Sequence, residues 1–243
     1  MTYTPDAAAV TMPALALRGI NVFPHMLLHF DVAREASIKA LDEAMSTASP
    51  IFLVTQRDLT VEHPQQEDLY PIGTIATVRQ ILRLPENNVR VMVEGTARGR
   101  LLTLYRAEPF LSVGVEEIPA AIKNRANSSK TEALIRQTYS LLERYTELSD
   151  RVTPETYLKV LASDDPDYIA DHVAQNLPLR YEDKQLILEE LRPVRRLEKL
   201  VRILTREGEI LEVEGDLEAK VHEQMAGNQR DYFLREQLKV IQR

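Results

Sequence analysis

The sequence predicts an α+β protein in which a β-rich N-terminal part precedes a helical bundle that ends in a long helix. Short apolar segments rich in β-branched residues, separated by turn residues, fill the first part, and this pattern is typical of strands. In the second part charged residues become dense and apolar residues recur at helical spacing. A chain of 243 residues is long enough to bury a core in one or two domains.

Residues 1–118 are expected to form a small, strongly bent β-structure with one helix. Apolar residues at helical spacing predict that helix over Ala33–Met45, and the polar segment Gln56–Asp68 is expected to be a surface loop. Gly95 and Gly99 are expected to mark bulges or corners between later strands. The expected strands are Ala14–Leu17, Leu27–Val32, Ile51–Thr55, the hairpin strands Ile72–Leu84 and Val89–Glu94, then Arg100–Arg106 and Phe110–Glu117.

Residues 119–129 are the expected linker, because a Pro and an Asn/Ser cluster there break both the helical and the strand period. Residues 130–243 are then expected to form the helical bundle. Glu207-Gly208 is expected to bend the chain into the final helix, which spans about 209–243. The preceding helices are expected to follow Ser128 or Ser129, to run from Pro154 towards Leu161, from 163–167 to Asn176, and over Tyr181–Glu190, with a buried seam of Leu197, Leu200, Val201 and Leu204.

The final stretch carries apolar residues at every fourth position, which predicts one long amphipathic helix with a narrow apolar stripe. No cap and no Pro follows Ile241, so we expect the sequence to be a piece of a longer chain that continues past Arg243. A stripe on a helix too long to bury alone predicts a self-association surface, and packing on the chain's own bundle is the alternative. The candidate contacts for self-association are Met225, Tyr232, Phe233 and Leu234.

Composition excludes several classes of function. The chain has no cysteine, which rules out disulfides and Cys-ligated zinc. Its net charge of −7 argues against a dedicated nucleic-acid binder, since phosphate contacts need a basic surface. No apolar run approaches the length of a membrane span, and the first residues lack the basic and apolar regions of a secretory signal.

Several segments in both parts of the chain resemble the Lon family of ATP-dependent proteases. Gln229–Gln242 closely resembles the segment just before the ATPase module of the bacterial Lon protease. Other matching segments follow in the order expected for that family, which makes their series more specific than any single one. They are Pro13–Arg18, Phe23-Pro24, Asp68–Thr74, Val93–Arg98, Leu177-Pro178, Lys184–Leu186 and Leu188-Glu189.

The resemblance implies that residues 1–118 form a substrate-binding domain with a PUA-like β-barrel, and that the final helix leads to an absent ATPase module. The intact parent would be a cytoplasmic homohexamer of the AAA+ class, an ATP-dependent serine endopeptidase that uses ATP and Mg. It would degrade misfolded, damaged and short-lived regulatory proteins. This fragment would capture unfolded or damaged substrates and help assembly, without a cofactor of its own.

The chain shows no sequence motif for catalysis. It contains no G-x-x-x-x-G-K-[ST] phosphate loop and no G-x-S-x-G nucleophile motif. Ser128-Ser129-Lys130 is explained better by a helix cap than by a Ser/Lys nucleophile pair. His25 and His29 lack the Cys or acidic partners of a metal site. We therefore predict no catalytic, cofactor-binding or metal-binding residue in this chain.

Binding of unfolded protein requires exposed apolar side chains, and two places in the N-terminal part offer them. One is the first loop and the other is the tip of the hairpin. The alternative for each residue is a place in the core. The substrate-binding candidates are Phe23, Pro24, Met26, Leu27, Leu82, Leu84 and Pro85.

Two other functions stay open. A stand-alone PUA-like binding module, acting as a substrate adaptor, would need no further domains, but the missing stop signal at the C-terminal end argues against it. A PUA-type RNA binder is the second, and the acidic balance of the chain argues against it.

Overall fold

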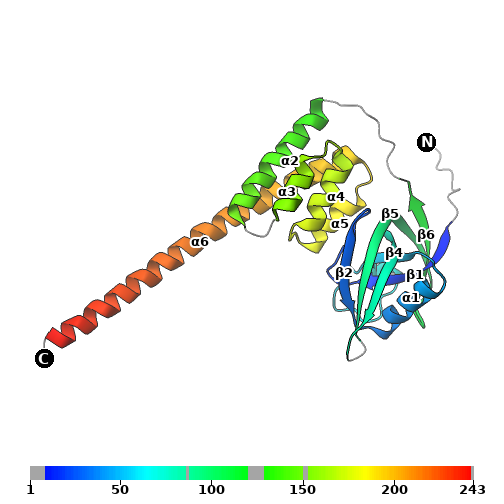
Figure 1. The fold of residues 1–243 in the computed structure, drawn as a ribbon, viewed down its shortest axis with the longest axis horizontal. Coiled ribbons are helices and arrows are strands. Elements are labelled where there is room, and N and C mark those ends of the chain that lie inside the picture. Colours follow the sequence, from blue (N-terminus) through cyan, green and yellow to red (C-terminus); the bar gives the residue numbers. More distant parts are fainter. Residues whose placement is uncertain (1–8, 86–87, 120–128, 150–152, 242–243) are drawn as a thin grey trace.

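The computed structural model describes residues 9–85, 88–119, 129–149 and 153–241, and the side chains of 226–228 and 230–241 lie outside the described part. A β-barrel with one helix lies beside a bundle of helices, and one of these helices projects far beyond the rest of the molecule (Figure 1). This arrangement confirms the predicted α+β fold. Among the described residues no helix is long and apolar enough to cross a membrane.

Six strands form a sheet that closes on itself. The strands follow the order β2-β5-β4-β3-β1-β6, and a further pairing of β5 with β6 closes the barrel. All pairings between these strands are antiparallel except that of β1 with β3. The strands are β1 (Val10–Leu17), β2 (Leu27–Val32), β3 (Ile51–Thr55), β4 (Ile72–Arg83), β5 (Val89–Arg106) and β6 (Leu111–Ile118), and helix α1 (Glu35–Ser46) connects β2 to β3.

The longest strand, β5, corrects the sequence prediction of two separate strands in this region. It runs through Gly95 and Gly99 without a break. A bulge lies beside Gly95, because Ala76 pairs with Gly95 while the preceding Ile75 pairs with Ala97. Both glycines are needed for close approach: a Cβ at Gly95 would lie 2.3 Å from the Phe23 carbonyl oxygen, and one at Gly99 would lie 2.6 Å from a methyl group of Val115.

The segment between β3 and β4 is less exposed than the sequence suggests. It contains a short 3-10 helix, η1 (Gln66–Asp68). The Gln56 side chain is fully buried, donates a hydrogen bond to the Val61 carbonyl (2.9 Å) and accepts one from Arg34 (3.1 Å). The prediction of a surface loop is therefore wrong at Gln56, because its amide finds partners that satisfy it inside the fold.

The helical bundle follows the predicted starts closely. Thr153 accepts a hydrogen bond from the backbone N–H of Thr156, and Asp165 accepts one from Asp167, so each caps a helix that begins with Pro. The predicted seam of four apolar residues, expected before the final helix, is buried and belongs to the last helix itself. The helices are α2 (Ser129–Leu148), α3 (Pro154–Leu161), α4 (Pro166–Asn176), α5 (Tyr181–Glu189) and α6 (Pro193–Ile241).

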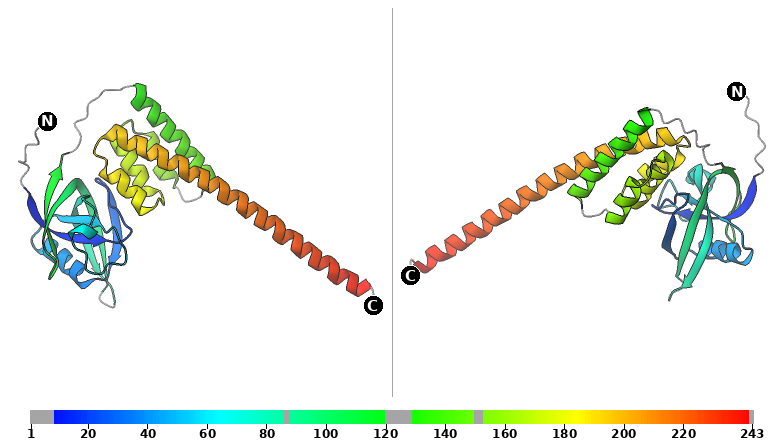
Figure 2. Two further views of the ribbon diagram at one scale, coloured as in Figure 1. Left: turned by 180° about the vertical axis from the view of Figure 1, so that it is seen from behind. Right: turned by 45° about the horizontal axis from the view of Figure 1, so that its top comes forward.

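The last helix is a single helix of 49 residues, and the expected bend at Glu207-Gly208 is wrong. Leu204 before the glycine is buried in the bundle and Leu211 after it packs against the same cluster. Burial on both sides outweighs the roughly 1 kcal/mol that a glycine costs in a helix. The helix therefore starts at Pro193 rather than near residue 209, and its second half projects from the bundle (Figure 2).

The barrel and the bundle share one hydrophobic core at their junction. Phe23, Met26 and Ile72 come from the barrel, yet they belong to the same buried cluster as residues of α2, α4, α5 and α6. A second cluster lies between α1 and the inner face of β2, β5 and β4, and a third lies under β1, β3 and β6. The junction is thus a packed interface and not a loose tether.

Candidate functional site

The seven predicted substrate-binding residues fall into two sets. Phe23 is fully buried, and Met26 and Pro24 are also buried. The prediction that the first loop is exposed is wrong for these three residues, because the loop inserts into the junction with the helices. Leu27 is 60% exposed and Leu82 is 52% exposed, so both remain candidates.

The hairpin tip is partly exposed. Pro85 is exposed and Leu84 is half-buried. The backbone N–H of Leu84 donates to the Asn88 carbonyl (2.8 Å), which holds the end of the hairpin closed. Leu27 lies at the opposite end of β2 from this tip, since Val32 at the far end of that strand pairs with Val89. The candidate residues therefore do not form one continuous patch.

Strand register instead aligns three apolar side chains across the outer face of β2, β5 and β4. Leu27 pairs with Glu94 of β5. Met92 lies two residues before Glu94 on that strand, and Arg90, which pairs with Leu82, lies two residues before Met92. Alternate residues of a strand share a face, so Leu27, Met92 and Leu82 form a diagonal row with steps of about 7–8 Å. We call these three residues the diagonal row.

Met92 was not among the residues predicted from the sequence. It is half-buried, and the buried valines on either side of it point to the core. The alternation of β5 from Val89 to Glu94 could have indicated this position, because the residues between buried valines must face outward. Methionine adapts its shape to varied apolar partners, which suits a surface without one fixed ligand.

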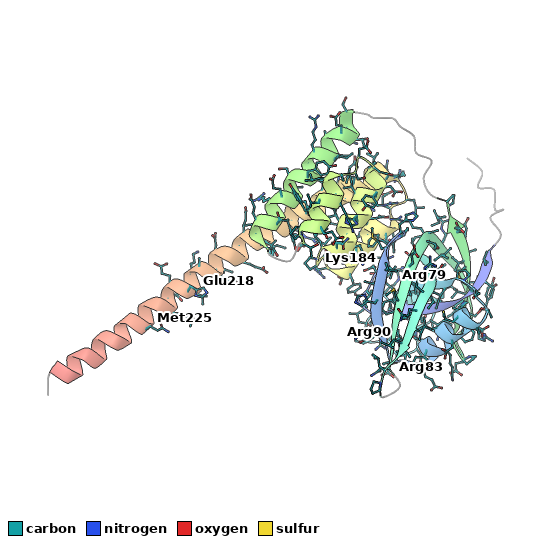
Figure 3. All side chains as sticks on the ribbon, in the orientation of Figure 1. Arg79, Arg83, Arg90, Lys184, Glu218 and Met225 are labelled. Carbon is teal, nitrogen blue, oxygen red and sulfur yellow. The ribbon has the colours of Figure 1, made fainter. Side chains whose placement is uncertain are left out.

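A bulge in β4 orients one residue of the diagonal row, and two ion pairs lie beside the row. The register shift between Val78 and Gln80 turns Leu82 outward, opposite Arg90. Arg90 forms a bidentate pair with Asp31 (2.7 and 2.9 Å) and lowers the pKa of that carboxyl through its hydrogen bonds. Arg79 bonds Glu94 (2.6 Å). Figure 3 shows Arg79 and Arg90 along these strands, with Arg83 nearer the hairpin tip.

The projecting half of α6 carries a second exposed apolar surface. Val213, Leu217, Val221 and Met225 are each more than half exposed. Met225 and Glu218 lie on the part of the helix that no other element covers (Figure 3). Tyr232, Phe233 and Leu234 belong to α6, but their side chains lie outside the described residues. We call Val213, Leu217, Val221 and Met225 the α6 stripe.

Two open grooves among the described residues were considered as binding sites. The larger groove, of about 650 Å³, lies at the start of α6 and is lined mainly by charged side chains. Its carboxylates are already paired, Glu198 with Lys130 (2.6 Å) and Glu190 with Arg192 (3.1 Å). No group of three His, Cys, Asp or Glu that could hold a metal occurs in the part of the chain that the structure describes.

Comparison with known proteins gives one consistent family. Residues 11–206 match the family model of the ATP-dependent protease La (LON) substrate-binding domain. The Lon protease of Heliobacterium modesticaldum is 44% identical over 232 residues, which cover 96% of this chain and 28% of that protein. The Lon protease of Brevibacillus choshinensis is 41% identical over 232 residues, covering 96% of this chain and 29% of that protein. The chain thus spans less than a third of the length of these relatives.

Solved structures have the same fold. The N-terminal domain of a Mycobacterium avium complex Lon protease superposes with a TM-score of 0.64 at 20% identity, covering 81% of this chain and 98% of that one. The Lon N-terminal domain protein of Xanthomonas campestris gives 0.54 at 17% identity, covering 79% and 98%. The match of the family model over most of the chain, together with these relatives, shows that the chain belongs to the Lon protease family and carries its substrate-binding domain.

Proposed function

We propose that this chain captures unfolded segments of protein substrates for an ATP-dependent serine protease of the Lon type. The observation that carries the proposal is the diagonal row, an exposed apolar surface on a domain that matches a substrate-binding family. Unfolded proteins differ from folded ones in the apolar side chains they expose. A surface of two exposed Leu side chains and the half-buried Met92 can bind such segments without reading a particular sequence.

The proposed contact is weak for a single segment. Three side chains offer little apolar area, and the ion pairs beside them keep the rest of the face hydrated. Several copies of the chain in one assembly would bind a long unfolded polypeptide at several points, which raises the overall affinity through effective concentration. Folded proteins would be released quickly because they expose fewer such segments.

Several further parts of the proposal concern the whole protein. We place its action in the cytoplasm, and propose that ATP and Mg bind in parts outside this chain, because this sequence has no phosphate loop. There the captured segment would be unfolded and cut within a ring of identical subunits. This chain would supply recognition and would position the substrate, without reacting groups of its own.

The first experiment is an NMR titration of the isotope-labelled chain with one protein in its folded and in its permanently unfolded form. We expect shifts at and around the diagonal row with the unfolded form alone. The double variant Leu27→Ser with Leu82→Ser should abolish these shifts, since both side chains are exposed and their loss leaves the core intact. Leu158→Ser with Leu186→Ser removes equally exposed leucines from the helical bundle and serves as the matched control.

Three results would contradict the capture proposal. Equal shifts with the folded form would show that the surface does not select unfolded chains. Unchanged binding in the Leu27/Leu82 variant, with loss in the Leu158/Leu186 control, would move recognition to the helical bundle. Shifts with RNA at low salt, in place of unfolded protein, would instead favour a nucleic-acid binder.

We also propose that the α6 stripe is a self-association surface. Its members are spaced by four residues on the part of α6 that projects from the bundle, where no other described element covers the helix, and each is more than half exposed. Burial of such a stripe between copies is the usual way to remove it from water. The other predicted self-association contacts, Tyr232, Phe233 and Leu234, lie further along the same helix.

Sedimentation equilibrium tests this second proposal. Leu217→Glu with Val221→Glu should lower the association constant of the chain by at least tenfold, because each change places a charge in an apolar contact. Ala219→Glu adds a charge to another exposed position of the same helix and is the matched control. An equal loss in the control would attribute association to net charge and not to the stripe.

A further inference from the structure

The junction between the barrel and the helices contains a buried charged contact in addition to its apolar core. Arg98 of β5 forms a bidentate pair with Asp171 of α4, at 2.9 and 2.7 Å. Its third donor, Nε, bonds the Leu188 carbonyl of α5 at 2.9 Å. One barrel arginine therefore donates from each of its three guanidinium nitrogens, and these bonds reach two different helices.

The contact continues from α4 into the base of α6. Arg196, in the first turn of α6, lies 3.3 Å from the same Asp171 carboxylate and also pairs with Asp167. Its Nε donates to the Glu190 carbonyl at 2.8 Å, which ties the end of α5 to the start of α6. The order of contacts is thus Arg98, then Asp171, then Arg196, leading from the barrel to the long helix.

These three side chains are buried. The side chains of Arg98 and Asp171 are each 8% exposed, and that of Arg196 is 2% exposed. Water therefore does not screen the charges, and each partner that moves away leaves an uncompensated charge in the interior. Two further polar contacts lie in the same junction, since Asn21 donates to Gln185 (2.8 Å) and Gln185 donates to the Ile72 carbonyl (2.9 Å).

Apolar and charged contacts differ in what they specify. The packing of Phe23 and Met26 against the helices stabilises contact, but burial of apolar area depends little on direction. A bidentate pair with a third hydrogen bond is satisfied in one geometry only. Replacing a buried pair by apolar residues often leaves stability unchanged, so the contribution that such a pair can make is to geometry.

We propose that the Arg98–Asp171–Arg196 contact fixes the orientation of the barrel on the base of α6, so that the two move as one body. These are positioning residues, and they touch no substrate. Their consequence for function rests on the proposed capture of substrates: a segment held on the barrel would then set the direction of α6. The orientation itself can be tested without any substrate.

The test uses residual dipolar couplings of the 243-residue chain in a weakly aligning medium. In the unmodified chain, backbone couplings from the barrel and from α4 to α6 should fit one alignment tensor. In the double variant Arg98→Met with Asp171→Leu, which replaces the pair by apolar side chains, we expect two tensors whose magnitudes differ by at least 1.5-fold. The control Arg83→Met with Asp42→Leu removes an exposed bidentate pair inside the barrel and should keep one tensor.

A single shared tensor in the Arg98/Asp171 variant overturns the proposal, because the apolar core alone would then hold the orientation. If that variant does not fold, Arg98→Lys tests the same point. Lysine keeps the charge but cannot form the bidentate pair, so two tensors are again expected. One tensor in Arg98→Lys would overturn the proposal. Because no substrate is present, these outcomes are independent of whether the chain binds unfolded protein.

Discussion

At the scale of single residues, burial decides what a charged side chain contributes. Arg90 and Arg98 both lie on β5 and both form bidentate pairs with an aspartate. The Arg90–Asp31 pair is about half exposed, whereas the Arg98–Asp171 pair is almost completely buried. Exposed pairs contribute little because water solvates the separated charges, while an unpaired charge in the interior is strongly unfavourable.

The first prediction follows from this contrast. Arg98→Met alone leaves Asp171 buried beside one arginine in place of two and removes the donor to the Leu188 carbonyl. We expect the free energy of unfolding to fall by about 3–5 kcal/mol, as measured by urea denaturation. Arg90→Met, on the same strand, should change it far less, because its pair with Asp31 is exposed to water. Similar losses in both variants would contradict the role given to burial.

The second residue-scale prediction concerns pH. His172 of α4 is 6% exposed, stacks on Tyr168, and its Nε2 has no hydrogen-bond partner among the described residues. Burial lowers the pKa of His172, so the unfolded chain takes up a proton before the folded chain does. Stability is therefore lost as the pH falls below about 6.5, the ordinary value for an unfolded-state histidine.

His172→Phe keeps a ring to stack on Tyr168 and removes the titration. Between pH 7 and 5, we expect the unfolding free energy of this variant to fall less steeply than that of the unmodified chain. The difference has an upper limit of about 1.4 kcal/mol per pH unit. Urea denaturation at several pH values measures it, and the comparison at pH 7.5 gives the packing effect alone. Identical slopes would contradict the prediction.

At the scale of elements, two segments are longer than sequence patterns suggest, and both run through glycine. In β5, Gly99 is required because Val115 and Phe52 approach too closely for a side chain. In α6, nothing lies within 4 Å of the position that a Cβ would take at Gly208. A glycine in a sequence does not reveal which of these two situations it occupies, since the difference lies in neighbours that are distant along the chain.

The third prediction uses this difference. Gly208→Ala should raise the free energy of unfolding by about 0.5–1 kcal/mol, because alanine favours the helix and the site has room. Gly99→Ala should lower it, because its Cβ would lie 2.8 Å from the Phe52 ring. Thermal and urea unfolding of the two variants measure both effects. A stabilised Gly99→Ala chain would contradict the close packing described for β5.

The types of element were predictable from the sequence because they depend on local signals. Caps such as Thr153-Pro154 and Asp165-Pro166 mark helix starts within a few residues, and the structure confirms them. The burial of Phe23 was not predictable in this way. Its partners belong to helices that follow more than a hundred residues later in the chain, and no local pattern distinguishes an apolar loop that inserts into an interface from one that faces solvent.

The candidate site was likewise predictable in part: its exposed leucines could be named from the sequence, but their alignment could not. Leu27 and Leu82 were named from the sequence, and both are exposed. Their alignment with Met92 depends on the bulge between Val78 and Gln80, which shifts the register by one residue. Without that bulge the outward and inward positions would exchange beyond it. The pattern of hydrophobic residues alone does not fix a bulge, so the diagonal row could not be derived from it.

At the scale of the whole molecule, the barrel and the bundle are joined by a common core. Phe23 lies in the barrel's first loop but packs in the cluster formed by the helices. Removing a barrel residue should therefore weaken the helices. Such coupling is expected wherever one buried cluster contains side chains from both parts.

The fourth prediction tests this coupling. Phe23→Ala should lower the free energy of unfolding by about 3–5 kcal/mol, because it removes a fully buried ring and leaves a cavity. Hydrogen exchange should show faster exchange in α4 and α5 as well as in the barrel. Leu27→Ala, four residues away and exposed, should change stability by about 0.5 kcal/mol or less. Loss of protection confined to the barrel would contradict a shared core.

The length of α6 has a mechanical consequence. About 29 residues separate Glu212, which still pairs with Arg144 of α2, from Ile241, and this corresponds to roughly 44 Å of straight helix at 1.5 Å per residue. A rigid lever of that length converts a tilt of about 7° at its base into a displacement of roughly 5 Å at its tip, close to the pitch of one helical turn. Small rotations of the barrel would thus be amplified to a distance on which packed helices change their contacts.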